Sequence, residues 1–234
     1  MSAAPLAVVI PALDEAGRLP LLLADLARGC DLIAELQLVD GGSSDGTPAV
    51  ARLGGARLLH SPPSRGLQLQ RGIAASSAPW LWLLHADARL PPNWPQRLRQ
   101  LMAAAALRPA QGPLAWYGSF RVDQGGLHYR LLERLVACRS ALLQRPYGDQ
   151  GLLIRRVDLL ACGGISPLPL MEDLDFAERF SRGGRWRPMG LEVTVSGRRW
   201  RRLGLLPTAW RNAQLRRDWR RGTSAQALWG RYQR

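Results

Sequence analysis

The sequence predicts an α/β fold with a mostly parallel central sheet, helices on both faces and a second half of mixed strand direction. Apolar runs recur with helix-compatible segments between them, in the order β-α-β-α-β-α-β. The runs Leu6–Ile10 and Trp80–Leu84 are almost continuously apolar, which is typical of strands buried on both faces of a parallel sheet. After Gly112 and Pro113 the pattern changes, and this change indicates the mixed second half.

The first half is expected to contain four strands joined by helices. The strands are expected at Leu6–Ala12, Glu35–Val39, Ala56–His60 and Trp80–His85. Thr47 is expected to cap a helix that ends at Gly54, because threonine before proline is a common helix start. Asn93 is expected to cap a helix that runs to Leu107.

In the second half we expect a strand at Leu114–Val122, a helix at Leu127–Leu143, a short strand at Gly151–Arg155 and a helix after Met171. The sequence has no internal repeat, low-complexity tract or linker. One domain over residues 1–234 is therefore expected, with parts at about 1–112 and 113–202 and a basic helical C-terminus at 203–234.

The net charge of +14 is carried wholly by arginine, because the chain contains no lysine. Fourteen arginines and two acids lie between Arg182 and the end, so this stretch could face phosphates, anionic lipid or only solvent. Three widely spaced cysteines without metal-ligand spacing favour a reducing cytoplasm. No apolar run is long enough for a signal sequence or a membrane span, so we expect a cytoplasmic protein, with peripheral membrane contact left open.

Acidic residues follow three of the expected strands. Asp14 and Glu15 follow the first, Asp40 ends the second, and Asp87 follows the fourth. Each alone suits a turn. Ligands of open α/β sheets bind at the carboxyl ends of the strands, so the three together indicate a binding site. Asp40 is expected to be exposed there and to add little to stability.

Three segments carry a family resemblance over about the first ninety residues: Val9-Ile10-Pro11 with Asp14-Glu15, Val39-Asp40 through Asp45-Gly46-Thr47, and Arg65 through Gly72. They resemble the family-2 glycosyltransferases, which have a GT-A type fold that binds a nucleotide-diphospho-sugar donor. The resemblance implies that residues 1–112 bind the donor and 113–202 the acceptor. The donor-binding residues that it implies are Pro11, Glu15, Asp40, Asp45, Arg65, Gln68 and Asp87.

His85-Ala86-Asp87 stands where that family carries an Asp-x-Asp metal motif. The resemblance implies that Asp87 holds Mn²⁺ or Mg²⁺ between itself and the donor phosphates. His85 replaces the first acid of the motif. It is either a nitrogen ligand, which would favour Mn²⁺, or a buried histidine bonded to backbone.

Met171 through Phe176 resembles the family's Glu-Asp motif, which implies that Asp173 is the general base and that Glu172 sets the charge beside it. One such base predicts inversion of the anomeric centre. The acceptor-region residues that the resemblance implies are Asp149, Gln150, Gly164, Arg199 and Trp200. The segments around Tyr147–Gly151 and Thr194–Trp200 are similar to small family members associated with radical-SAM or selenium-domain proteins. Ser196 replaces the glutamine of the polymerase motif, which favours a single transfer.

Two other functions are weighed. A sugar nucleotidyltransferase would want a glycine-rich loop with lysine after the first strand, and the acidic loop at Asp14 and Glu15 argues against it. A nucleic-acid-binding protein is allowed by charge but leaves the acidic strand ends unexplained. The acceptor stays open between a small molecule and a lipid-linked one. The segment with Trp210, Leu215 and Trp219 could lie at a membrane, but packing on the core is preferred.

Overall fold

A computed structural model describes residues 5–107 and 112–233 of the chain. One seven-stranded sheet forms its centre, with the strand order β3-β2-β1-β4-β6-β5-β7. The strands are β1 (Leu6–Ala12), β2 (Ile33–Asp40), β3 (Arg57–His60), β4 (Trp80–Leu83), β5 (Leu114–Val122), β6 (Leu152–Arg155) and β7 (Arg185–Val195). Only β6 pairs antiparallel with its neighbours, and the other pairings are parallel. The predicted α/β fold with a mostly parallel sheet and a mixed second half is confirmed.

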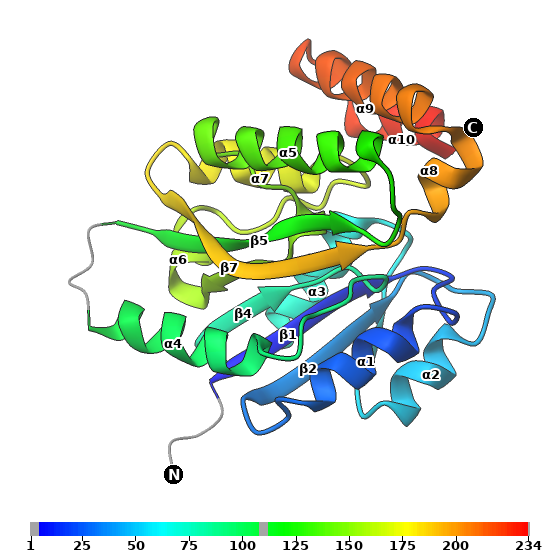
Figure 1. Cartoon of the computed structure of the whole chain (residues 1–234). Coiled ribbons are helices and arrows are strands. Elements are labelled where there is room, and N and C mark those ends of the chain that lie inside the picture. Colours follow the sequence, from blue (N-terminus) through cyan, green and yellow to red (C-terminus); the bar gives the residue numbers. More distant parts are fainter. Residues whose placement is uncertain (1–4, 108–111, 234) are drawn as a thin grey trace.

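Helices cover both faces of this sheet (Figure 1). They are α1 (Leu19–Ala27), α2 (Thr47–Leu53), α3 (Arg65–Ala74), α4 (Trp94–Ala106), α5 (Leu127–Leu142), α6 (Arg156–Ala161), α7 (Glu172–Phe180), α8 (Arg198–Leu203), α9 (Leu205–Arg220) and α10 (Ala225–Gln233), with a 3₁₀ turn η1 at Gly148–Gln150. Helices α1, α2 and α4 pack on one face, and α3, α6 and α7 pack on the other.

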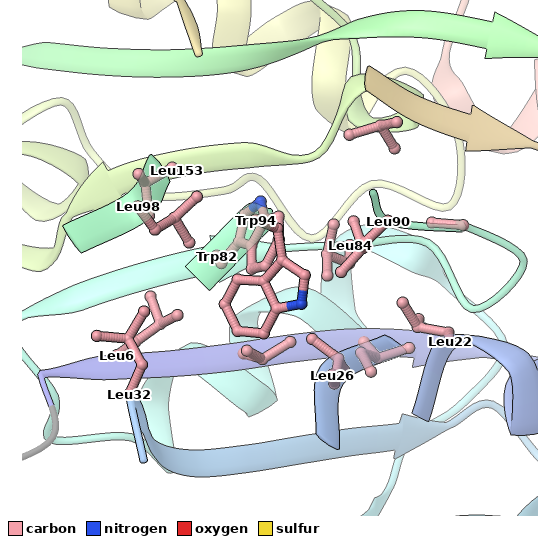
Figure 2. Packing of buried hydrophobic residues seen from close by; sticks show 14 of the residues in the cluster. Leu6, Leu22, Leu26, Leu32, Trp82, Leu84, Leu90, Trp94, Leu98 and Leu153 are labelled. Atoms are coloured by element: carbon pink, nitrogen blue, oxygen red, sulfur yellow. The ribbon is translucent and has the colours of Figure 1, made fainter. Parts of the chain in front are cut away.

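Successive residues of a strand point to opposite faces, so β1 contributes to two cores. Val8 packs with the side chains of α1 and α4, whereas Val9 packs with those of α3 and α7. On the first face, the rings of Trp82 and Trp94 lie 5.2 Å apart, and the indole N–H of Trp94 donates to the backbone oxygen of Asp25 at 2.9 Å. Figure 2 shows these two rings among leucines of α1, α4 and the strands. The continuous apolarity of the central strands follows from this burial on both faces.

The register aligns the carboxyl ends of β1, β2 and β3 along the same side of the sheet. Ala12 of β1 pairs with Asp40 of β2, which in turn pairs with His60 of β3. Strand β1 lies between β2 and β4, so the chain switches direction across the sheet at β1. Crevices of ligand-binding α/β proteins lie at such a point, outside the carboxyl ends of the strands.

Several local expectations differ from the structure. Strand β7 was not predicted, because arginine, proline and glycine occupy exposed positions in it and obscure the alternation of apolar and polar residues. Helix α2 begins at Thr47 itself, and Gly46 is the residue at the capping position. The Thr47 hydroxyl does not cap the helix, because it donates to Asp45 and accepts from the Glu15 N–H. Asn93 does precede α4, but its side chain makes no capping hydrogen bond. The fourth strand ends at Leu83, so His85 lies in the loop that follows.

The basic C-terminus contains helices α9 and α10, and part of it packs on the protein. Leu215 of α9 and Leu228 of α10 are buried in a cluster with Met171 and Leu174, and Trp219 is partly buried against it. Trp210 is 69% exposed. Packing on the core therefore accounts for Leu215 and Trp219 but not for Trp210. Among residues 5–107 and 112–233, no helix is both long and apolar enough to cross a membrane.

The start of α3 is pressed against the loop that precedes α7. The Gly66 N–H donates to the Leu168 oxygen at 3.0 Å, and a β-carbon at Gly66 would lie 2.2 Å from the Ser166 oxygen. Backbone atoms cannot yield as a flexible side chain can, so a residue larger than glycine must push the loop away.

Gly66→Ala is therefore expected to lower the free energy of unfolding by about 1–2 kcal/mol, although alanine favours helices by about 1 kcal/mol over glycine. The measurement is urea unfolding followed by circular dichroism. Gly17 is exposed with open space around it, so Gly17→Ala serves as the control and should change stability by less than about 0.5 kcal/mol. Equal stability of the Gly66 variant and wild type would contradict this packing.

Candidate active site

A cavity of about 520 Å³ opens at the edge of the sheet where β1 and β4 end. The loops after β1 and β4 form one side, and the start of α3, η1, the start of α7 and the helices α9 and α10 close the others. Nine of the sequence-predicted site residues line it: Pro11, Glu15, Arg65, Gln68, His85, Asp87, Asp149, Asp173 and Trp200. Residues that are far apart in the sequence therefore meet in this cavity.

Five other predicted site residues lie outside the cavity wall: Asp40, Asp45, Gln150, Gly164 and Glu172. The backbone of Arg199 belongs to α8, but its side chain lies outside the described part of the structure. The contacts of the five residues are within the protein. They support the loops that carry the cavity-lining side chains.

Asp40 is buried, with 2% of its surface exposed, so the expectation of an exposed strand-end acid was wrong. Its carboxylate accepts hydrogen bonds from the backbone N–H groups of Gly42 and Ser43, both at 3.1 Å, and from the Ser43 hydroxyl. The Nδ1 atom of His60 lies 3.7 Å away. The side chain therefore closes the turn after β2, because it satisfies donors that the turn leaves free.

The turn after β2 is fastened to the turn after β1. The Asp45 carboxylate accepts from the Ala16 N–H at 3.0 Å, and the Thr47 hydroxyl accepts from the Glu15 N–H at 2.8 Å. A hydrogen bond from the Thr47 hydroxyl lowers the pKa of Asp45. Asp14, in the left-handed region at φ 53°, accepts from the Ser44 N–H at 2.8 Å. These bonds fix Glu15 at the rim of the cavity.

Glu15 pairs with Arg198, which comes from the first turn of α8. Its other carboxylate oxygen, Oε2, is buried and has no partner among the described residues. Burial raises the pKa of Glu15, and the effect of Arg198 opposes it. An unpaired buried acceptor is unfavourable, so this oxygen is ready to accept a hydrogen bond from a bound ligand.

Gln68 lines the cavity and also forms hydrogen bonds with the ends of two strands. Its side-chain amide donates to the backbone oxygens of Ala12 and Val39, both at 2.8 Å. These oxygens lie at the ends of β1 and β2. Helix α3 is therefore tied to the edge of the sheet where the strand-end loops begin.

Asp87 and His85 are the residues that could take part in metal binding. Asp87 lines the cavity and makes no hydrogen bond or ion pair with the described residues. Burial, together with the positive charge of Arg65, lowers the pKa of His85 to about 3, so its ring is neutral near pH 7. Within the described ranges, no group of three or more acidic, histidine or cysteine side chains is arranged to hold a metal. A carboxylate without a protein partner and a neutral imidazole in the same cavity wall fit a cation whose other ligands are phosphates and water.

Arg65 stands between the two sides of the cavity. Its guanidinium lies 3.4 Å from Oε1 of Glu172, which is 1% exposed and has no partner at Oε2 among the described residues. Burial raises the pKa of Glu172 to about 7, and Arg65 opposes this shift. Glu172 therefore holds Arg65 in place from behind the cavity wall.

Asp173 and Asp149 form the opposite wall. The Gly148 N–H donates to Oδ2 of Asp173 at 3.1 Å, which joins η1 to α7. Asp149 has a buried oxygen, Oδ1, without a partner in the described structure, and burial raises its pKa to about 6. A β-carbon at Gly148 would lie 2.9 Å from Nε2 of His85, so η1 packs closely on the loop after β4.

The remaining predicted acceptor residues differ in position. Gln150 is buried, accepts from Arg139 and from the Ser140 hydroxyl, and donates to the Gly118 oxygen at 3.1 Å. Gly164 accepts from Arg179, so it belongs to a supporting loop. Trp200 lines the cavity and packs edge-on against Phe120, with ring centroids 6.0 Å apart.

The polar residues of the cavity wall that were not among the predicted site residues include Arg139, Tyr147, Arg198 and Arg216. Tyr147 and Arg198 lie inside the segments Tyr147–Gly151 and Thr194–Trp200, whose resemblance to family members was the signal for them. Arg139 and Arg216 lie within helices rich in arginine, where nothing in the sequence separates an inward from an outward side chain.

Carboxylates and arginines around a cavity at the switch point of an open α/β sheet are typical of enzymes that bind phosphorylated nucleotides. A family model described as glycosyl transferase family 2 matches residues 7–139, more than half of the chain. The chain belongs to glycosyl transferase family 2.

Curated relatives agree with this assignment. An uncharacterized glycosyltransferase of Mycobacterium bovis is 30% identical over 167 residues, which are 64% of this chain and 72% of that protein. A PGL/p-HBAD biosynthesis glycosyltransferase of Mycobacterium tuberculosis is 35% identical over 97 residues, 38% of each chain. A TPR repeat-containing protein of Synechococcus elongatus is 34% identical over 145 residues. The match covers 58% of this chain but only 32% of that protein.

Among solved structures, glucosyl-3-phosphoglycerate synthase of Mycobacterium tuberculosis is similar, with a TM-score of 0.56 and 22% identity over 81% of this chain and 70% of the other. That protein was crystallised with Mn²⁺, UDP and glucosyl-3-phosphoglycerate, and also with Mg²⁺ and UDP. At this identity the likeness concerns the fold, and it confirms the predicted GT-A type.

Asp40→Ala is expected to lower the free energy of unfolding by about 1–3 kcal/mol, because it leaves the turn after β2 without its acceptor. Urea unfolding gives the value. Asp31 is an exposed acid paired with Arg99, so Asp31→Ala is the control and should lose at most about 1 kcal/mol. If both variants were equally stable, the buried hydrogen bonds of Asp40 would have no structural role.

Proposed function

We propose that the protein transfers a single sugar from a nucleotide-diphospho-sugar to an acceptor hydroxyl, with inversion and with a divalent metal. One observation carries this proposal: the unpaired Asp87, the arginine Arg65 and the carboxylate Asp173 face the same cavity at the switch point of the sheet. The family and the UDP complexes of the structural neighbour support it. The resemblance to radical-SAM or selenium-domain associated members is proposed only as a subgroup.

The donor lies along the ends of β1 and β4 in this proposal. Pro11 and Glu15 line that side, and Glu15 offers a free oxygen to a hydroxyl or N–H of the nucleoside. Asp40 and Asp45 act through the two turns that they hold together. Arg65 offers its guanidinium to the phosphates, because Glu172 occupies only one side of it.

Mn²⁺ or Mg²⁺ would be held by Asp87, with His85 as a further ligand for Mn²⁺. The metal supplies positive charge that stabilises the leaving diphosphate. Asp87 serves this task because its carboxylate makes no hydrogen bond or ion pair with the described residues. The neutral state of His85 keeps a ring nitrogen free of a proton.

The acceptor lies between η1, α7 and the C-terminal helices. Asp173 accepts the proton of the acceptor hydroxyl, and the Gly148 N–H orients its carboxylate. The hydroxyl then attacks the anomeric carbon from the face opposite the leaving diphosphate, so one displacement inverts that carbon. Retention by double displacement would need a carboxylate placed as nucleophile on the other face.

Asp87→Ala is expected to abolish metal-dependent donor binding and donor hydrolysis, because it removes the carboxylate that holds the cation. The assay screens UDP-, GDP- and TDP-sugars with Mn²⁺ and with a chelator. Asp31 is exposed and does not line the cavity, so Asp31→Ala is the control and should keep full activity. Full activity of the wild type in excess chelator would rule out the metal.

Asp173→Asn is expected to reduce turnover by about 100-fold or more while donor affinity stays unchanged, since the amide keeps the size but cannot take a proton. Turnover is followed by release of nucleoside diphosphate, and NMR of the product gives the anomeric configuration. A retained configuration, or wild-type turnover of the variant, would assign the base elsewhere, with Asp149 and Asp175 as the next candidates.

A further inference from the structure

Two arginines on the acceptor side of the cavity have no carboxylate partner. Arg139 of α5 donates to the Arg145 backbone oxygen and to the Gln150 side chain, both at 3.0 Å. Its guanidinium carbon lies 3.6 Å from the centre of the Tyr147 ring. All these partners are neutral. Asp149 lies within electrostatic reach of Arg139, but the two form no ion pair in the described structure.

Arg216 of α9 is half-buried and lines the same cavity. Its guanidinium makes no hydrogen bond or ion pair with any residue of the described part of the chain. Burial lowers its pKa, and so do the positive charges of Arg139 and Arg220, whereas Tyr147 and Asp173 act in the opposite direction. Arginine keeps its proton under such shifts, so the cavity contains two cations that repel each other.

The other arginines of the cavity wall are paired. Arg65 lies beside Glu172, and Arg198 lies beside Glu15. Arg198 also lies within electrostatic reach of Asp87, and Arg65 lies within reach of both Asp173 and Asp87. Arg216 lies within reach of Asp173, the proposed base, but forms no ion pair in the described structure. The two arginines without an ion pair are therefore on the proposed acceptor side.

A half-buried cation without an ion-pair partner loses part of its hydration, so an anion that arrives with a ligand would stabilise it. We propose that Arg139 and Arg216 bind an anionic group, phosphate or carboxylate, of the sugar acceptor. This assignment to the acceptor rests on the proposed function. The C-terminal helices contribute to this part of the cavity, because Arg216 comes from α9, and Trp229 and Tyr232, which line the same cavity, come from α10. The acceptor is then a small acid that carries its hydroxyl near the anionic group.

The test uses inorganic phosphate and acetate, each titrated calorimetrically into the full chain that is already saturated with UDP and Mn²⁺. UDP fills the donor phosphate positions, so the added anion reports on the second subsite. Arg216→Gln is expected to weaken binding of the preferred anion at least about tenfold, because it removes a charged hydrogen bond. Arg216→Lys keeps the charge and should lose less. Arg217→Gln, its exposed neighbour on α9, is the control and should bind as wild type does.

The anion that binds more tightly, phosphate or acetate, identifies the anionic group that the acceptor carries. Equal anion affinity of Arg216→Gln and wild type, with UDP binding intact in both, would overturn the subsite and leave the proposed function standing. A loss of UDP affinity in Arg216→Gln with anion affinity unchanged would assign Arg216 to the donor and overturn the inference as well. A wild type that binds no nucleoside diphosphate would instead contradict the proposed function.

Discussion

The close packing of helix α3 on the ends of β1 and β2 is the constraint on which the site depends. Gly72 allows this contact, because a β-carbon there would lie 2.4 Å from the Val9 side chain, and Gln68 bonds to both strand ends. The same helix carries Arg65 into the cavity and presses Gly66 against the loop before α7. One helix therefore sets the distance between the strand-end loops and the wall formed by η1 and α7, and these parts cannot move apart without breaking the contacts.

The distribution of charge in the cavity follows from which groups are paired within the protein. Glu172 and Glu15 compensate Arg65 and Arg198, so these arginines are held in fixed positions before any ligand binds. Asp87 and Arg216 have no such partner among the described residues. Preformed ion pairs reduce the reorganisation that a reaction requires, whereas unpaired groups gain most from a ligand of opposite charge. The proposed metal and the proposed acceptor anion correspond to these two unpaired groups.

The sequence predicted the strands of the first half and the acids at their ends, because buried parallel strands are continuously apolar and their carboxyl ends meet at one edge. It could not predict what each acid contacts. Asp40 looks like Asp87 in the sequence, yet one closes a turn and the other faces the cavity. Arg216 was missed because its neighbours in space come from distant segments, and helix α9 has no clear apolar face that would orient it.

A crystal structure with UDP and Mn²⁺, with the manganese located by its anomalous scattering, tests the central claim that donor and metal meet at the ends of β1 and β4. The account predicts manganese bonded to a carboxylate oxygen of Asp87 and to the diphosphate, with the nucleoside beside Pro11 and Glu15. Manganese away from Asp87, or UDP bound outside this cavity, would contradict it.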